Sequence, residues 1–277
     1  MTTETGRVSL SAMRAGGDNS SPATSIVPLD LEGARLLVLT GAGVSAESGL
    51  ATFRDSNGLW ERHRVEDVAS PEGFLRDPEL VWRFYSLRRE QAKTVDPNPG
   101  HRAIAAVEAR LKENFLLVTQ NVDGLHQRAG SERVIEIHGS LFRTKCWACD
   151  LEPFPDEASY LGRALPTCDE CEANGRKALL RPDIVWFGEM LDPRHLREID
   201  AFLRRDRDRP LVFLAVGTSG AVWPAAGLVN LAREAGGTAI LVNAEAAENT
   251  ARFHRFLQGK SAEILPVLLG ADRSASR

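Results

Sequence analysis

All four cysteines of the chain stand in two pairs with the spacing of metal ligands. Cys146 and Cys149 form one Cys-x-x-Cys pair, and Cys168 and Cys171 form the other. Two such pairs supply four thiolates, the ligand set of a closed tetrahedral zinc site, while a redox pair is the alternative. Because no ligand position is left open for water, we expect one structural zinc ion per chain.

A second group of chemically capable residues follows five short apolar runs. The runs are 35–39, 115–119, 134–137, 211–216 and 239–242. The residues after them are Thr40-Gly41-Ala42-Gly43-Val44-Ser45-Ala46, Gln120-Asn121-Val122-Asp123, His138-Gly139-Ser140, Gly217-Thr218-Ser219 and Asn243-Ala244-Glu245. Near-continuous apolar strands favour a parallel sheet covered on both faces, in which ligands bind beyond the carboxyl ends. We therefore expect these polar groups to line one crevice.

The first of these strand ends carries a glycine motif. Gly41-x-Gly43-x-x-Ala46 fits the dinucleotide-binding pattern, in which glycines let the backbone approach a pyrophosphate, although a plain glycine-rich turn is the alternative. The usual pattern also has an acidic residue after the next strand, and here no strand follows. The chain is therefore not an ordinary NAD dehydrogenase, and Glu245 is the better candidate for binding a ribose.

His138 is the candidate general base. A neutral imidazole at a strand end can accept a proton from a hydroxyl near pH 7, although a purely structural histidine is the alternative. Asn121 and Asp123 could position an amide or a water molecule, and Asp123 could instead cap the helix that follows.

The elements between the strands look helical. Asn98 can cap a helix with Ile104, Val107 and Leu111 on one face, and Pro224 suits the first turn of a helix that stops at Gly236-Gly237. A weaker sixth strand is expected at 262–265. Strands that alternate with helices predict a doubly wound α/β domain.

Two stretches interrupt this alternation and predict insertions. Residues 61–96 look helical without a convincing strand, and residues 142–178 hold the four cysteines. Residues 1–30 read as a flexible tail. We expect one catalytic domain over 31–272, with its α/β core at about 31–60, 97–141 and 179–270.

Composition limits the possible partners. Apolar residues make up 43% and charged residues 26% of the 277-residue chain, with a net charge of −4. These values are typical of a globular protein and give no general attraction to nucleic acid or anionic membranes. No apolar run approaches the ~18 residues of a membrane span, and no secretory signal is evident. We expect a cytoplasmic monomer.

Together these motifs resemble the sirtuin family over about residues 31–270. The matching segments are 41–50, 52–54, 119–126, 137–139, the four-cysteine module, 184–189, 217–219 and 243–245. The resemblance implies a Rossmann-like domain with a small module of helices and zinc ribbon, which cleaves NAD to remove acyl groups from lysine side chains of proteins.

The resemblance also assigns roles to residues. It implies that His138 is the catalytic base, that Asn121 and Asp123 hold the nicotinamide end of NAD, and that products are nicotinamide, O-acyl-ADP-ribose and free lysine. Implied NAD contacts are Gly41, Ala42, Gly43, Ser45, Glu47, Thr52, Phe53, Arg54, Trp60, Gln120, Asn121, Asp123, Gly217, Thr218, Ser219, Asn243, Glu245 and Ser261. The implied contacts of a substrate peptide, paired as a strand, are Val185, Phe187, Gly188 and Glu189.

One departure from the family pattern indicates the class III branch. Ala51-Thr52 stands where most members have Pro-Asp, and Tyr85-Ser-Leu-Arg88 supplies the Tyr-x-x-Arg pair of that branch. Tyr85 and Arg88 share a helical face and could bind a carboxylate, which predicts removal of succinyl and malonyl groups and possible removal of acetyl groups. A packed tyrosine beside a solvated arginine is the alternative.

Two other functions remain open from the sequence. One is mono-ADP-ribosyl transfer to a protein nucleophile, which uses the same NAD site. The other is a non-enzymatic module that binds NAD or zinc, against which the complete set of His138, Asn121 and Asp123 argues.

Overall fold

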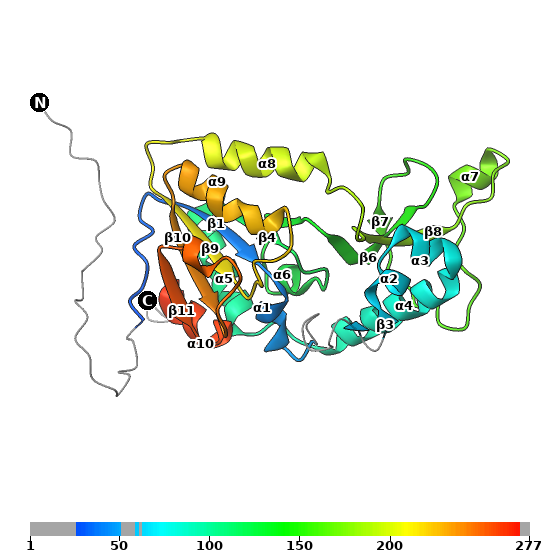
Figure 1. Ribbon diagram of the computed structural model, residues 1–277, viewed down its shortest axis with the longest axis horizontal. Helices are drawn as coiled ribbons and strands as arrows, with labels where there is room; N and C mark the ends of the chain where they lie inside the picture. Colours follow the sequence, from blue (N-terminus) through cyan, green and yellow to red (C-terminus); the bar gives the residue numbers. More distant parts are fainter. Residues whose placement is uncertain (1–25, 51–58, 61–62, 272–277) are drawn as a thin grey trace, which may run out of the picture.

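A six-stranded parallel sheet forms the larger of two lobes in the computed structural model, which describes residues 26–50, 59–60 and 63–271 (Figure 1). The strands are β1 (Arg35–Thr40), β4 (Phe115–Thr119), β5 (Val134–Glu136), β9 (Leu211–Val216), β10 (Thr238–Asn243) and β11 (Arg255–Gln258). They lie in the order β11-β10-β9-β1-β4-β5. Successive strands run outward from β1 on one side and from β9 on the other. The strand order therefore reverses between β1 and β9, where open α/β sheets bind ligands.

Helices cover both faces of this sheet. On one face, α8 (Pro193–Arg204) and α9 (Leu228–Glu234) bury apolar side chains against Leu37 and Phe213. On the other face, α5 (Pro99–Leu111) and α10 (Ser261–Leu268) do the same. The predicted doubly wound α/β arrangement is confirmed.

The predicted sixth strand at 262–265 is wrong. These residues lie in α10, because Ile264, Leu265 and Leu268 line one buried helical face. The sixth strand is β11. The helix predicted after Pro224 begins as the 3-10 turn η3 (Ala225–Gly227) before α9. The other short elements are α1 (Ala42–Ala46), η2 (Lys112–Asn114), α6 (Leu125–Arg128) and η4 (Thr250–Arg252).

A smaller lobe packs helices against an antiparallel sheet (Figure 1). The sheet contains β7 (Phe154–Pro155), β6 (Gly139–Cys146) and β8 (Leu180–Ile184) in that order, and the helices are α2 (Val65–Val68), α3 (Pro71–Arg76), α4 (Pro78–Thr94) and α7 (Asp169–Ala173). Buried Arg89 of α4 donates to the carbonyl oxygen of Leu141 at 2.5 Å and forms an ion pair with Asp156 at 3.0 Å. These bonds fix α4 to the small sheet.

The structure shifts several predicted boundaries. The small sheet begins at Gly139 and includes β8, so the zinc module extends beyond 142–178 at both ends. The insertion predicted to lack strands contains β3 (His63–Arg64), which pairs with β2 (Leu59–Trp60). Residues 26–30 of the predicted tail are packed, since Ile26 and Leu29 lie against the core and the Leu29 N–H donates to Leu268.

Candidate active site and metal centre

The turn after β1 packs directly against the turn after β9. The Gly43 N–H donates to the Gly217 carbonyl at 2.8 Å, and the Gly41 N–H donates to the Val216 carbonyl at 3.0 Å. A Cβ added to Gly43 would lie 2.7 Å from the Gly217 Cα, so a side chain cannot be accommodated there. These glycines bring two strand ends together, and their predicted contact with a pyrophosphate stays a prediction.

Beside this turn, Ser45, Asn121 and Asp123 form a buried hydrogen-bonded cluster. The Ser45 hydroxyl donates to Asp123 Oδ2 at 2.7 Å, and Asn121 Nδ2 donates to Ser45 Oγ at 3.1 Å. Asp123 Oδ1 accepts the N–H of Leu125, the first residue of α6, at 2.9 Å, while the N-cap position itself is Gly124. That bond uses one carboxylate oxygen, and the other accepts from Ser45.

His138 lies where the chain crosses from the large sheet to the small one, between β5 and β6. Its Nδ1 is 3.1 Å from the carbonyl oxygen of Gln120. Because a carbonyl oxygen only accepts, Nδ1 carries the proton and Nε2 is the basic nitrogen. Burial lowers the pKa of His138, and the bond to Gln120 opposes this in part. A neutral imidazole with a defined basic nitrogen is the form that a general base requires.

Gly139 allows β6 to start immediately after His138. Its φ is +82°, and a Cβ there would lie 1.9 Å from the Asp183 carbonyl oxygen. The close approach lets the Val185 N–H donate to the His138 carbonyl at 2.9 Å. The candidate base is therefore bonded directly to Val185, the first of the predicted peptide contacts.

Further side chains join the strand ends across the sheet. Gln120 Nε2 donates to Thr218 Oγ1 at 3.0 Å, and Asn243 Nδ2 donates to the Thr218 carbonyl at 3.1 Å. The Ser219 carbonyl accepts the Glu248 N–H. The predicted convergence of polar groups after β1, β4, β9 and β10 is thus seen in the fold.

Other predicted NAD contacts lie at the edge of this cluster or outside it. Glu245 is exposed after β10. A Glu47 carboxylate oxygen accepts the Ser261 N–H at 2.7 Å and its hydroxyl at 2.6 Å, so this pair caps α10. Ala42 opens α1, and Trp60 belongs to β2. Thr52, Phe53 and Arg54 lie outside the described residues.

Tyr85 and Arg88 lie one turn apart on α4, and both are buried, which excludes the alternative of a solvated arginine. Arg88 Nη1 donates to Gln91 Oε1 at 2.8 Å. The Tyr85 hydroxyl accepts a hydrogen bond from Trp186 Nε1 at 3.0 Å. Trp186 belongs to the predicted peptide-binding segment that follows β8.

The peptide-binding segment itself is partly exposed. Phe187 is 58% exposed, and Gly188 next to it has a φ of +89°. The Glu189 carboxylate accepts from Arg181 at 2.5 Å and 2.9 Å and from the Trp186 N–H at 2.8 Å, so this side chain holds the segment in shape.

Sequence reasoning missed Arg181 and Trp186. The Arg181 guanidinium lies 3.5 Å from the centre of the Trp186 ring, and both residues are buried. The available signal was Arg181 between apolar Leu180 and Ile184 at the ends of a short strand, since a buried charge needs partners.

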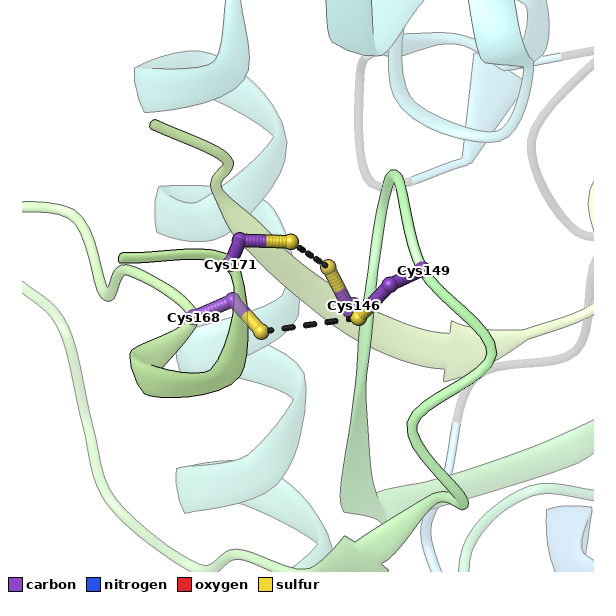
Figure 2. A group of neighbouring side chains, drawn as sticks. All are labelled: Cys146, Cys149, Cys168 and Cys171. Atoms are coloured by element: carbon purple, nitrogen blue, oxygen red, sulfur yellow. Dashed lines mark hydrogen bonds between the residues drawn. The ribbon is translucent and has the colours of Figure 1, made fainter. Parts of the chain in front are cut away.

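The four cysteines converge in the small lobe (Figure 2). Their sulfur atoms all lie within 4.8 Å of one another, with 3.7 Å from Cys146 to Cys171 and from Cys149 to Cys168. A tetrahedron with Zn–S bonds of ~2.3 Å has an edge of roughly 3.8 Å, so the spacing fits zinc. A disulfide needs an S–S bond of ~2.0 Å, and all four cysteines are free.

A zinc ion held by these four cysteines would have a structural role. Cys146 ends β6, whose first residue follows His138, and β6 spans Gly139–Cys146. At ~3.3 Å per residue the two ends of that strand are roughly 20 Å apart. A metal ion there is too far from His138 to polarise a reacting group.

The chain resembles known proteins over most of its length. Residues 41–224 match the model of the Sir2 family. The chain belongs to the Sir2 family. It is 42% identical over 245 residues to the NAD-dependent protein deacylase of Pyrococcus furiosus, covering 87% of this chain and 94% of that protein. The corresponding protein of Bdellovibrio bacteriovorus is 47% identical over 233 residues, covering 83% and 93%.

Solved structures agree with this sirtuin in fold. A Sir2 homolog–NAD complex has a TM-score of 0.76 at 42% identity and covers 87% of this chain and 90% of that one. A Sir2 protein bound to an acetylated peptide has a TM-score of 0.71 at 28% identity, covering 86% and 93%. The predicted class III sirtuin, an NAD-dependent protein deacylase with NAD as co-substrate, is confirmed. Among the described residues, no helix is long and apolar enough to cross a membrane.

Proposed function

We propose that this sirtuin removes acidic acyl groups, succinyl or malonyl, from protein lysines in preference to acetyl. The observation that carries this proposal is the buried pair of Tyr85 and Arg88 on α4. An acetyl group ends in a methyl and needs only an apolar pocket. A succinyl group ends in a carboxylate, whose loss of water must be offset by a fixed cation and a hydrogen-bond donor.

The electrostatics around Arg88 support its placement beside the reaction site. Burial raises the pKa of Tyr85 and of Asp123, while the Arg88 guanidinium lowers both. Its charge therefore acts on the tyrosine hydroxyl and on the carboxylate of the strand-end cluster. The Arg88 guanidinium is therefore suited to bind the carboxylate of an acyl group whose lysine end reaches the strand-end cluster.

We assign the chemical roles to three residues. NAD supplies the ribose carbon that receives the acyl group as nicotinamide departs. Asn121 and Asp123, fixed by Ser45, orient the nicotinamide end of NAD. His138, with its proton held on Nδ1 by Gln120, takes a proton from a ribose hydroxyl at Nε2.

We assign peptide binding to the segment Ile184–Glu189. The N–H groups of Val185 and Phe187 already donate to His138 and Ala69, so pairing with a peptide has to use their carbonyl groups. Exposed Phe187 supplies apolar contact area beside them. The Sir2 structure with an acetylated peptide, 28% identical to this chain, supports binding of an acyl-lysine peptide.

The proposal is tested by competition among peptides that differ only in the acyl group. With NAD present, succinyl- or malonyl-lysine peptide should give the higher kcat/KM, and nicotinamide release should require an acyl peptide. Equal or greater kcat/KM for the acetyl peptide would contradict the preference. If the ADP-ribose becomes attached to a protein and not to the acyl group, the reaction is ADP-ribosyl transfer.

A further inference from the structure

Beneath the turn that carries Asn121, two histidines and two threonines form a buried polar row. The four residues are His101 of α5, His126 of α6, Thr40 of β1 and Thr119 of β4. Each is at most 2% exposed. Such a row within an apolar core costs folding free energy unless its hydrogen bonds are satisfied, so its geometry needs an explanation.

The hydrogen positions follow from the partners, starting at Asn121. Thr119 Oγ1 accepts the Asn121 N–H at 3.1 Å and a second hydrogen from the Thr40 hydroxyl at 2.8 Å. The hydroxyl of Thr40 has one proton, which this bond uses. His126 Nε2, 2.9 Å from Thr40 Oγ1, must therefore be the donor in that contact.

The other end of the row is fixed at the start of α5. The Asn98 N–H donates to His101 Nδ1 at 3.3 Å, so the proton of neutral His101 is on Nε2. Within the described part of the chain, neither His101 Nε2 nor His126 Nδ1 has a hydrogen-bond partner. One is a donor and the other an acceptor, on rings that contact each other with centroids 4.8 Å apart. The contact between the two histidines is therefore one of ring packing.

The row requires both histidines to be neutral. Burial lowers the pKa of His101 to about 4 and the pKa of His126 well below its ordinary value. A protonated ring has two donors and no acceptor, so protonated His101 could not accept the Asn98 N–H.

We propose that His126, Thr40 and Thr119 form a relay of hydrogen bonds, with the ring of His101 packed against its far end, that positions Asn121 for nicotinamide cleavage. This inference rests on the role proposed above for Asn121. The Thr40 carbonyl also accepts the Gln120 N–H at 2.9 Å, so β1 holds the Gln120–Asn121 turn by backbone and side chain together. The relay residues are positioning residues, since none of them is proposed to touch NAD. Only Asn121, which they position, has that role.

The test compares Thr40→Val with Thr40→Ser. Valine keeps the shape of threonine and removes the hydroxyl, while serine keeps the hydroxyl. A misplaced catalytic group costs up to ~100-fold in rate, so kcat for Thr40→Val should fall roughly 10- to 100-fold. The KM for acyl peptide and the Kd for ADP-ribose should not change, and Thr40→Ser should restore kcat. Melting curves establish that each variant is folded.

A double variant separates a relay from independent packing defects. Thr119→Val interrupts the same series one step closer to Asn121. If the relay acts as a unit, Thr40→Val/Thr119→Val should be no slower than the slower single variant, whereas independent defects multiply. Four outcomes would each overturn the relay. Thr40→Val could keep the wild-type kcat, or Thr40→Val and Thr40→Ser could lose kcat equally. The losses in kcat could multiply in the double variant, or Thr40→Val could also lose affinity for ADP-ribose.

Asn121→Ala distinguishes this inference from the proposed function. Loss of turnover in Asn121→Ala with wild-type kcat in Thr40→Val overturns the relay and leaves the role of Asn121 intact. Wild-type turnover in Asn121→Ala overturns that role, and the relay with it.

Discussion

The indole Nε1 of Trp186 donates a hydrogen bond to the Tyr85 hydroxyl at 3.0 Å, and both side chains are buried in the small lobe. Tyr85 belongs to α4, and Trp186 follows β8. The bond therefore links the helix that we assign to acyl recognition with the segment that we assign to the peptide. Arg181 stacks on Trp186 and pairs with Glu189, which fixes the segment from its other side. The two parts of the proposed substrate site are held together before any substrate binds.

The zinc site predicts a direct dependence of folding on metal. Zinc bound by four thiolates contributes its binding free energy to the folded state. Cys168→Ser should lose zinc, which elemental analysis detects as less than one ion per chain, and should lower the melting temperature. Chelation of the wild-type protein should act in the same direction. A metal-free protein with the wild-type melting temperature would show that the cysteine cluster is not a zinc site.

The geometry of His138 predicts a severe loss of deacylation in His138→Ala. A general base contributes about 10²- to 10⁴-fold in rate. The fold and NAD binding should survive, because the glycine turn after β1 is held by Gly217 and not by the histidine. Because burial lowers the pKa of His138, the wild-type kcat/KM should stay constant at neutral pH and fall only in acid, as Nε2 becomes protonated. Wild-type turnover in His138→Ala would refute its role.

The sequence predicted the parts of the fold that depend on local pattern. The five apolar runs became strands of one sheet, because a parallel sheet buried on both faces needs such runs. Asn98 caps α5 as predicted, with Gly100 and His101 N–H groups bound to its Oδ1. Cys-x-x-Cys spacing was equally informative, because a metal fixes the distances among its own ligands.

The parts that failed depend on contacts between distant residues. Residues 262–265 form a helix because Glu47, far away in the sequence, caps its first turn. Residues 180–184 were predicted to belong to the α/β core, yet they form β8, which pairs with β6 in the small sheet. The relay through Thr40 and His126 joins β1 to α6, and no local spacing reveals that pairing.

Two buried neutral histidines predict a loss of stability in acid. Burial lowers the pKa of His101 to about 4 and that of His126 well below its ordinary value, whereas both titrate near ~6.5 in the unfolded chain. Below that pH the unfolded chain binds more protons than the folded protein, so the free energy of unfolding falls as the pH drops. Each histidine contributes up to ~1.4 kcal/mol per pH unit, down to its folded pKa.

The measurement for this prediction is urea unfolding at several pH values between about pH 7 and about pH 5, where unfolded histidines gain protons. His101→Gln cannot titrate, so its unfolding free energy should depend less steeply on pH than that of the wild type, even though the variant is less stable at neutral pH. Identical slopes for the two proteins would mean that His101 does not remain neutral in the folded state.

The acyl preference is tested most sharply at Arg88. Arg88→Met keeps much of the buried side-chain volume and removes the cation. Hydrogen bonds to charged groups are worth ~1.5–3 kcal/mol each, so kcat/KM for succinyl peptide should fall roughly 10- to 100-fold or more, at ~1.4 kcal/mol per decade. Acetyl turnover should hold steady or rise, because a buried charge has been removed. Tyr85→Phe should shift the preference the same way but more weakly, and it also leaves Trp186 Nε1 without its acceptor, which costs stability.

The decisive quantity is the ratio of succinyl to acetyl kcat/KM in wild type and Arg88→Met. The Arg88 charge also acts on Asp123, but both substrates use the same Asp123, so any effect through that carboxylate cancels in the ratio. Arg83→Met is the matched control, because Arg83 lies on the same helix with an exposed side chain and carries the same charge. The ratio should fall for Arg88→Met and keep its wild-type value for Arg83→Met. If the two variants behave alike, Arg88 does not bind the acyl carboxylate, and the preference for acidic acyl groups loses its physical basis.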